Sequence, residues 1–332
     1  MILLDQIGIP SPGYTAKSSG ENGKRRHLTS DFAFEKVDLP FVKDYFQWQK
    51  LMKAKSTYLD SLQREVVDGF VHPFFNLHTV QTYRSSSDSP NIQNQIRRDA
   101  EMAEVIRKCY IPRQGHVLVE RDMKALEFKI AACFWQDPGM LDYASDPTLD
   151  VHRDLAAKCF KCKKAEVTKQ MRDIGKNGFV FPHLYGSYYG KIAPHMWQDS
   201  ESLQLGEQSV HEHLQAKGVE RLGTHNEGNP GPDTFLYHIK KVEDWFDRKF
   251  SVFASSREKW YADYLKNCGF RLMTGCWSEG RFSKNELMNT PIQGPAFHTV
   301  LWSIIKLQEW IDRTKSKVKS VAEIHDSIHA HV

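Results

Sequence analysis

The segment HVLVERDMKALEFKIAACFW, residues 116–135, places an aspartate between two regular patterns. Residues 117–119 form a short apolar run that predicts a buried strand, and residues 125–135 repeat apolar side chains at the spacing of an α-helix. Asp122 lies between them, at the carboxyl end of the predicted strand. The segment therefore predicts a strand that presents one carboxylate at its end and is followed directly by a packed helix.

A second aspartate occupies a comparable position near the other end of the sequence. Asp326 lies at the tip of a hairpin predicted between strands at 321–324 and 328–330. Adjacent strands would bring Asp122 and Asp326 to one pair of metal ions. Phosphoryl transfer from a nucleoside triphosphate uses two divalent ions bridged by carboxylates, because charge builds on both the attacking and the leaving oxygen. Taken singly, either aspartate is more typical of a turn than of a metal site.

Length and composition indicate a folded, globular chain. The 332 residues suffice for one large multi-lobed domain or two ordinary ones. The formal charge of +4 and the pI near 8.6 are weak evidence for a nucleic-acid partner. Six cysteines without regular spacing, in a sequence without a signal peptide, predict reduced thiols in the cytoplasm. Cys159 and Cys162 lack the second pair that a zinc site needs, and no apolar run approaches the length of a membrane span.

Periodicity predicts a mostly helical chain with short strands. Residues 10–30 are expected to form a loop, residues 66–95 short strands and turns, and residues 199–232, which are polar and rich in glycine and proline, a flexible inserted surface segment. Helices are expected at 41–62, from about 95 to 109, and at 151–161, 166–190, 234–268 and 291–313.

The helix expected at 166–190 has the residues of a nucleotide site. Lys169, Arg172 and Lys176 share one helical face, and an aromatic-rich stretch, FVFPHLYG at 179–186, follows them. A basic stripe is more often solvated surface. Cations beside stacking rings nevertheless suit a nucleoside triphosphate.

Two motifs resemble those of family A DNA polymerases, the DNA polymerase I-like enzymes, with a likeness to the phage type. Residues 119–129, VERDMKALEFK, resemble the first palm motif of that family, and residues 324–327, IHDS, resemble its last. The resemblance implies an α+β right-hand fold with an antiparallel palm sheet, helical fingers and a partial thumb. It also implies a template-directed DNA polymerase in which Asp122 and Asp326 are catalytic and bind two Mg²⁺ ions, and in which Glu127 is the gate against ribonucleotides.

The basic stripe resembles the fingers helix of the same family. The resemblance implies that Arg172 and Lys176 hold phosphates, that Phe181 stacks on the incoming base and that Tyr185 guards the template. The spacing from Lys176 to Tyr185 is one residue longer than in the family. We therefore expect a one-residue bulge near 178–182, where Pro182 disturbs the helix. Phe179 is the alternative stacking residue.

Contacts with the primer-template are implied at several further positions. A polymerase must hold every sequence, and it can do so through minor-groove acceptors that all base pairs share. The residues expected to contact DNA are Arg84, Gln93, Asn94, Asn289, Gln293, Lys53 and Lys55, and His325 is expected beside the nucleotide. Asn285 stands where the family often has arginine, and Ser327 stands where many members have a further carboxylate.

The resemblance divides the sequence into four parts. These are a thumb remnant and thumb-palm helix at 1–65, a first palm part at 66–160, fingers at 161–285 and a second palm part at 286–332. The expected partners are primer-template DNA and deoxynucleoside triphosphates, without a membrane, in a bacterial or phage-infected cell. Because no exonuclease cluster precedes the palm and both ends look cut, a second polypeptide that completes the polymerase is a further expected partner.

Three other functions remain as alternatives. A single-subunit RNA polymerase shares the right-hand architecture but has no need of a carboxylate gate at Glu127. A catalytically incomplete fragment would bind nucleic acid without extending a primer. A metal-dependent nuclease could use paired aspartates, but it has no need of Arg172 and Lys176 followed by aromatic rings.

Overall fold

The computed structural model describes residues 40–94, 96, 100–224 and 231–332, and the predicted loop at 10–30 lies outside them. The chain forms two compact units. One comprises Met1–Phe74 and Ser87–Ile111, and the other comprises Phe75–Ser86 and Pro112–Val332. Strands β3 (Phe74–Asn76) and β4 (Ser86–Asp88) straddle the boundary. The four-part division expected from the sequence stays a prediction.

The first unit contains the helix predicted at 41–62, and the prediction is confirmed. Helix α3 (Pro40–Lys53) continues through a π-helical segment, η1 (Ala54–Leu59), into α4 (Asp60–Glu65). Val42, Ala54, Tyr58 and Leu62 are its buried side chains. A small antiparallel pair, β1 (Val66–Val67) and β2 (Phe70–Val71), follows it, and α5 (Ala100–Arg107) completes the described elements of this unit.

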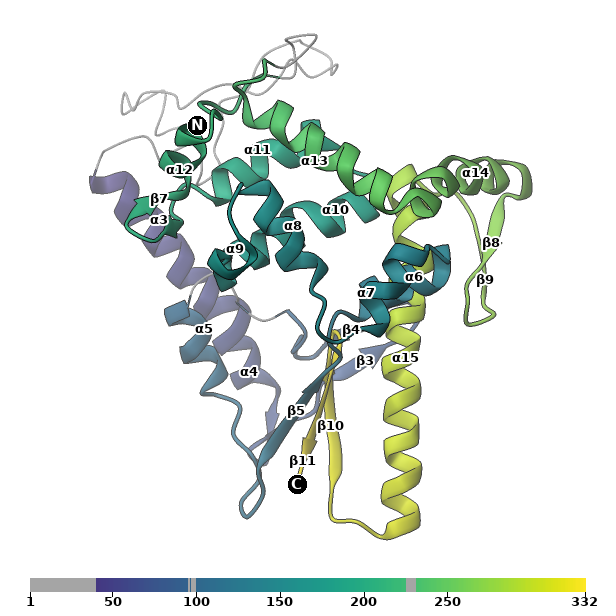
Figure 1. The fold of residues 1–332 in the computed structure, drawn as a ribbon. Helices are drawn as coiled ribbons and strands as arrows, with labels where there is room; N and C mark the ends of the chain where they lie inside the picture. Colours follow the sequence, from purple (N-terminus) through teal and green to yellow (C-terminus); the bar gives the residue numbers. More distant parts are fainter. Residues whose placement is uncertain (1–39, 95, 97–99, 225–230) are drawn as a thin grey trace, which may run out of the picture. The chain divides into compact units, whose positions relative to one another are not determined.

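The second unit is built on a three-stranded antiparallel sheet in the order β10-β11-β5 (Figure 1). Its strands are β5 (Leu118–Asp122), β10 (Lys319–Ile324) and β11 (Ser327–His331), as predicted. The expectation that the first of them is buried is wrong, because every residue of β5 except the partly buried Val119 is exposed. Helix α15 (Lys284–Thr314) lies beside this sheet: its Ala296 and Val300 are buried with Leu126, and Ile328 of β11 packs against them. These contacts attach the strand ends to the helical part of the unit.

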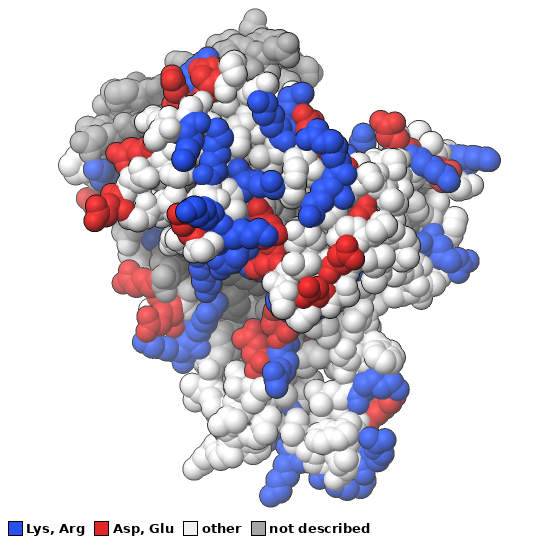
Figure 2. Space-filling view, viewed as in Figure 1, with Lys and Arg blue, Asp and Glu red and all other residues white. Residues whose placement is uncertain are grey.

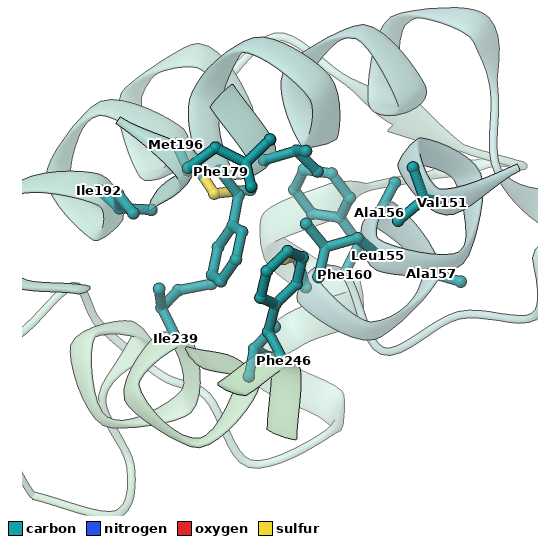
Figure 3. Packing of buried hydrophobic residues seen from close by; sticks show 14 of the residues in the cluster. Val151, Leu155, Ala156, Ala157, Phe160, Phe179, Ile192, Met196, Ile239 and Phe246 are labelled. Carbon is teal, nitrogen blue, oxygen red and sulfur yellow. The ribbon is translucent and has the colours of Figure 1, made fainter. Parts of the chain in front are cut away.

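Helices form most of the rest of the second unit (Figure 1). The longer ones are α6 (Leu126–Trp135), α7 (Pro138–Ser145), α8 (Val151–Cys159), α11 (Tyr189–Asp199), α13 (Phe235–Lys249) and α14 (Ser251–Asn267). Figure 3 shows Phe179 and Phe246 meeting inside a cluster of buried apolar side chains that we call the main core. Leu155 of α8 and Phe160, which directly follows that helix, also belong to this cluster. Because apolar side chains separated widely in the sequence meet here, this core holds the helices in place.

The expectation of a flexible insertion at 199–232 is wrong for its described part. A short hairpin of β6 (Gln204–Leu205) and β7 (Gln208–Ser209) leads into α12 (Val210–Ala216), which Ser209 and Glu212 start with a reciprocal capping box. Val210 and Leu214 are fully buried in the main core. The apolar residues that anchor this polar segment are few. They are too few to produce a recognisable apolar periodicity in the sequence, so their burial could not be predicted from it.

Other helix boundaries also differ from the predictions. The helix expected at 234–268 is two helices that meet at Phe250, and α7 and the hairpin of β8 (Gly269–Arg271) and β9 (Trp277–Glu279) were not predicted. Helix α15 starts before the expected residue 291 and carries Pro291 in its interior. Proline cannot donate to the carbonyl four residues earlier. That carbonyl, on Leu287, instead accepts a hydrogen bond of 3.1 Å from Trp260 Nε1.

The helix expected at 166–190 is divided, and its irregularity confirms the predicted extra residue. After a 3₁₀ turn, η2 (Lys164–Glu166), the chain forms α9 (Lys169–Ile174), the π-helical η3 (Gly175–Val180) and α10 (Phe181–Leu184). A π-turn holds one residue more than an α-turn. The bulge therefore lies slightly earlier than the expected 178–182, and Pro182 falls in the first turn of α10.

A glycine permits close packing where η3 meets α8. A Cβ atom added at Gly175 would lie 2.9 Å from Cβ of Ala156 and 3.0 Å from the carbonyl oxygen of His152. Both atoms belong to α8, and neither is the end of a flexible side chain. Gly175 therefore sets the distance between the helix that carries His152 and the segment that carries Arg172 and Lys176. Among the residues that the structure describes, no helix is long and apolar enough to cross a membrane.

We expect the substitution Gly175→Ala to lower the free energy of unfolding by roughly 1–3 kcal/mol, because an extra methyl group in a packed contact forces the backbone apart. Urea unfolding followed by tryptophan fluorescence measures this change. Gly178→Ala is the matched control in the same π-helical segment, because its added Cβ would meet only the side chains of Met196 and Ile174. An equal loss in both variants would contradict the proposed close packing.

Candidate active site

Strand pairing brings together the two aspartates that the sequence singled out. Asp122 is the last residue of β5 and pairs with Ser327, the first residue of β11. Asp326 lies in the turn just before β11, where its carbonyl oxygen accepts a hydrogen bond of 3.1 Å from the Met123 amide. His325, also in this turn, has a left-handed φ of 57°. The register of the sheet therefore places both aspartates at the same end of neighbouring strands.

The carboxyl group of Asp326 is in an acidic, partly buried environment. Burial raises its pKa above the ordinary value, and the negative charges of Glu127 and Asp122 act in the same direction. Arg84 and Lys176 oppose this shift without cancelling it. The arrangement concentrates negative charge that a divalent cation would neutralise.

Glu127 is the centre of a buried polar network. It lies on the first turn of α6, and its Oε2 atom accepts a hydrogen bond of 2.8 Å from the Tyr185 hydroxyl. Its Oε1 atom is ion-paired with Nη2 of Arg84, which also lies 3.9 Å from Oδ1 of Asp326. Burial, followed by the charge of Glu127, raises the pKa of Tyr185, and the side chain of Gln293 also hydrogen-bonds to that hydroxyl. The network therefore links Glu127, the predicted gate against ribonucleotides, with Tyr185, the predicted template guard. It also includes Arg84 and Gln293, which are predicted to contact DNA.

Arg84 is held in place by the segment on which it lies. A Cβ atom at Gly294 of α15 would lie only 3.1 Å from the carbonyl oxygen of Thr82, so glycine allows this segment to lie against the helix. Next to Arg84, Ser85 Oγ donates a hydrogen bond of 2.7 Å to Oε2 of the buried Glu323. In the sequence Ser85 stands beside Arg84 and Glu323 lies in the strand predicted before Asp326, but neither was expected to have a role, because nothing in the sequence indicates that they meet.

The predicted nucleotide-binding side chains lie on α9, η3 and α10. The Nε atom of Arg172 donates a hydrogen bond of 2.7 Å to Oδ2 of Asp150. The Nζ atom of Lys176 lies 5.3 Å from the ring centroid of Phe181, which stacks on Tyr185 at 6.0 Å. Figure 2 shows lysine and arginine side chains gathered over α8 and α9, with acidic side chains between them.

The two candidate stacking rings have different environments. Phe179 is fully buried in the main core, with its ring centroid 5.8 Å from that of Phe246. Phe181 is partly exposed and lies beside Lys176. The geometry therefore favours Phe181 as the ring that can meet a ligand, although its role stays a prediction.

His152 is a site residue that the sequence analysis missed. It is 1% exposed, and neither ring nitrogen has a hydrogen-bond partner among the described residues. Its ring lies 5.7 Å from that of Phe181. Burial, followed by the charges of Arg172 and Lys176, lowers its pKa to about 4, so the imidazole is neutral at pH 7. In the sequence, His152 stands at the start of a predicted helix. A histidine at such a position is also typical of a packed core, so its position alone did not indicate a site.

Four of the predicted DNA contacts lie in the first unit. Gln93 is buried and Asn94 is exposed, and the amides of both donate hydrogen bonds of 3.0 Å to Oδ1 of Asn91. Lys55 is ion-paired with Asp60 at 2.7 Å, and Lys53 is the exposed last residue of α3. In the second unit, Oδ1 of Asn289 is buried without a hydrogen-bond partner among the described residues. The roles of these residues stay predictions.

The carboxylate oxygens at the site are suitable ligands for a hard divalent cation that also binds substrate. Among the described residues there is no group of three histidine, cysteine, aspartate or glutamate side chains placed to hold a metal alone. Mg²⁺ is commonly bound by one or two carboxylates, with water and substrate phosphates completing its octahedral shell. Asp122 and Asp326 could provide that pair of carboxylates.

Comparison with known proteins shows the family. The model of DNA polymerase family A matches residues 1–332. The chain belongs to DNA polymerase family A. Curated relatives in this family include DNA polymerase I of Pseudomonas aeruginosa, with 25% identity over 98% of the chain and 32% of that protein. DNA polymerase I of Lactococcus lactis subsp. cremoris is 27% identical over 99% of the chain and 34% of its own length.

The family also contains phage and structurally characterised relatives. The DNA polymerase of Bacillus phage SP01 is 25% identical over 98% of the chain and 33% of that protein. The POL domain of Pol1 from M. smegmatis, in complex with DNA primer-template and dNTP, has a TM-score of 0.73 at 20% identity. That likeness covers 100% of this chain and 53% of that one. The predicted family and α+β polymerase fold are confirmed, and the chain spans about a third of its curated relatives.

We expect Asp326→Asn to stabilise the metal-free protein at neutral pH. Because folding raises the pKa of Asp326, the folded state favours the protonated carboxyl. Its contribution to stability is present below the ordinary carboxyl range and is lost as the pH rises through the raised value. The neutral amide avoids that loss, so the gain should shrink as the pH falls to about 4.

Thermal unfolding between pH 4 and 8, with and without MgCl₂, measures this effect. Asp142→Asn, at an exposed position of α7, is the control for loss of one negative charge. Mg²⁺ should raise the melting temperature of the wild type more than that of Asp326→Asn. An Asp326→Asn variant that is less stable at pH 8 than at pH 4, relative to wild type, would contradict the assignment.

Proposed function

We propose that this chain is a template-directed DNA polymerase that adds deoxynucleotides to the 3′-hydroxyl of a primer. The observation that carries the proposal is the placement of Asp122 and Asp326 at adjoining strand ends, next to the buried network around Glu127. The curated relatives named DNA polymerase I, and the related domain with bound primer-template and dNTP, support it. The relatives include bacterial and phage polymerases, so we propose the cytoplasm of a bacterium or phage-infected cell as the location.

The proposed mechanism assigns a separate task to each group. Asp122 and Asp326 would hold two Mg²⁺ ions, which when bound activate the primer hydroxyl and neutralise charge on the leaving pyrophosphate. Arg172 and Lys176 bind the phosphates, and Phe181 supports the base. Neutral His152, whose ring nitrogens have no hydrogen-bond partner among the described residues, would donate one hydrogen bond to the same phosphates.

Primer and template would be held by further polar side chains. Arg84, which is ion-paired with Glu127 and lies 3.9 Å from Asp326, is proposed to contact the primer end. Gln293 and Asn289 lie on α15 and are proposed to contact the minor groove. His325 is proposed to lie beside the nucleotide, and Gln93, Asn94, Lys53 and Lys55 are proposed to contact the duplex.

We expect Asp122→Asn and Asp326→Asn each to reduce the rate of primer extension roughly a thousandfold or more, which corresponds to about 4 kcal/mol of transition-state stabilisation. Single-nucleotide extension under saturating dNTP measures the rate, with Asp142→Asn as the control. Wild-type rates in both site variants would rule out the assignment. Binding of duplex DNA by the wild type without extension would favour the alternative in which a second polypeptide completes the polymerase.

We expect Glu127→Ala to increase the use of ribonucleotides relative to deoxynucleotides by on the order of tenfold to a hundredfold, because space for a 2′-hydroxyl is opened. The ratio of kcat/KM for matched rNTP and dNTP measures this. Tyr185→Phe removes the hydrogen bond to Glu127 but keeps the carboxylate, so it should change the ratio much less. Equal use of both sugars by the wild type would favour the RNA polymerase alternative.

A further inference from the structure

Asp150 connects two parts of the proposed phosphate site through one carboxylate. It is the N-cap residue of α8, and its Oδ1 atom accepts hydrogen bonds of 3.1 Å from the amides of His152 and Arg153. Its other oxygen, Oδ2, accepts the hydrogen bond of 2.7 Å from Nε of Arg172. The same side chain therefore fixes the start of the helix that carries His152 and the orientation of Arg172 on α9.

The contact leaves the outer part of the Arg172 guanidinium available. Within the described residues, Nε is the guanidinium atom that makes a hydrogen bond, and Nη1 lies 4.0 Å from Oδ1 of Asp173. A guanidinium presents five N–H donors in a rigid plane. Fixing Nε therefore fixes the directions of the four donors on Nη1 and Nη2, which is the geometry needed to bind phosphate oxygens in pairs.

The carboxylate is ionised under ordinary conditions. Burial acts to raise the pKa of Asp150, but the hydrogen bonds from Arg172 and the Arg153 amide outweigh it, and the pKa is lowered. The hydrogen bonds from the donors that Asp150 orients therefore offset the unfavourable free energy of partly burying its charge. The close contact at Gly175 keeps α8 and the α9-η3 segment at the distance that this bridge requires.

We propose that Asp150 is a positioning residue of the nucleotide site, which holds Arg172 so that its terminal amino groups face the triphosphate. This inference rests on the proposed function. The opposite interpretation is that Asp150 competes with the phosphates for Arg172. The two interpretations predict opposite signs, because removal of a competitor would strengthen nucleotide binding and removal of a positioning residue would weaken it.

Asp150→Asn and Asp150→Ser test the proposal. Asparagine and serine are both good N-cap residues, so the start of α8 is retained while the ionic contact with Arg172 is lost. We expect the KM for dNTP to rise about tenfold, equivalent to about 1.4 kcal/mol, with kcat changed less than about threefold because the metal ligands are untouched. Equilibrium binding of inorganic tripolyphosphate should weaken by a similar factor, and this readout needs no turnover.

The same helix provides a matched control. Asp154 is also a carboxylate on α8, but it binds Lys164 at 2.6 Å and the Tyr143 hydroxyl at 2.7 Å. Asp154→Asn removes a comparable charge and should leave the KM and tripolyphosphate affinity within about twofold. An Asp150→Asn variant that behaves like Asp154→Asn, or that binds nucleotide more tightly than wild type, would overturn the inference.

A double-mutant cycle separates this inference from the function on which it rests. In an Arg172→Ala background, Asp150→Asn should add less than about a twofold change, because the group that it positions is absent. Full additivity of the two effects would contradict positioning. If Arg172→Ala alone leaves nucleotide and tripolyphosphate binding unchanged, the proposed phosphate contact fails as well, whereas a large Arg172→Ala effect with no Asp150→Asn effect overturns the inference alone.

Discussion

The antiparallel pairing of β11 with β5 is the constraint on which the site depends. It places Ser327 opposite Asp122, and so brings Asp326 next to an aspartate from a distant part of the sequence. Side chains alternate between the two faces of a strand, so a slip of one residue would turn Asp122 to the other face. Ile328, partly buried against α15 and α6 on the opposite face, opposes such a slip because it would have to leave its apolar contacts.

The negative charges around Asp326 are partly balanced by Arg84, which lies on a segment packed closely against α15. The negative charges of Glu127 and Asp122 add to the effect of burial in raising the pKa of Asp326, and Arg84 is ion-paired with Glu127 and lies 3.9 Å from Asp326. Arg84 can reach them because Gly294 leaves room for the backbone of its segment. Removing one partner of such a buried network leaves the other charges uncompensated, which is more costly than the net contribution of the pair. Site geometry and local stability are therefore linked.

The sequence predicted those features that depend on local patterns. The strand before Asp122 and the hairpin around Asp326 each have a signature within a few residues, and the extra residue between Lys176 and Tyr185 was expected from the family's spacing. The burial of Val210 and Leu214 had none, because their segment is mostly polar and only the tertiary core reveals their partners. His152 was missed for a related reason: that its ring nitrogens have no hydrogen-bond partner among the described residues is apparent only when the surrounding helices are in place.

The π-helical segment Gly175–Val180 changes which side chains before and after it lie on the same face of the helix. An additional residue in one turn shifts every later side chain by about 100° around the helix axis relative to an uninterrupted α-helix. The segment thus acts as a phase shift between two helical registers, with Arg172 counted in the first and Phe181 in the second. It brings Phe181 round to the side of Lys176, whereas Phe179, two residues earlier, points into the core. The inserted residue thereby decides which side chain shares a face with the cation.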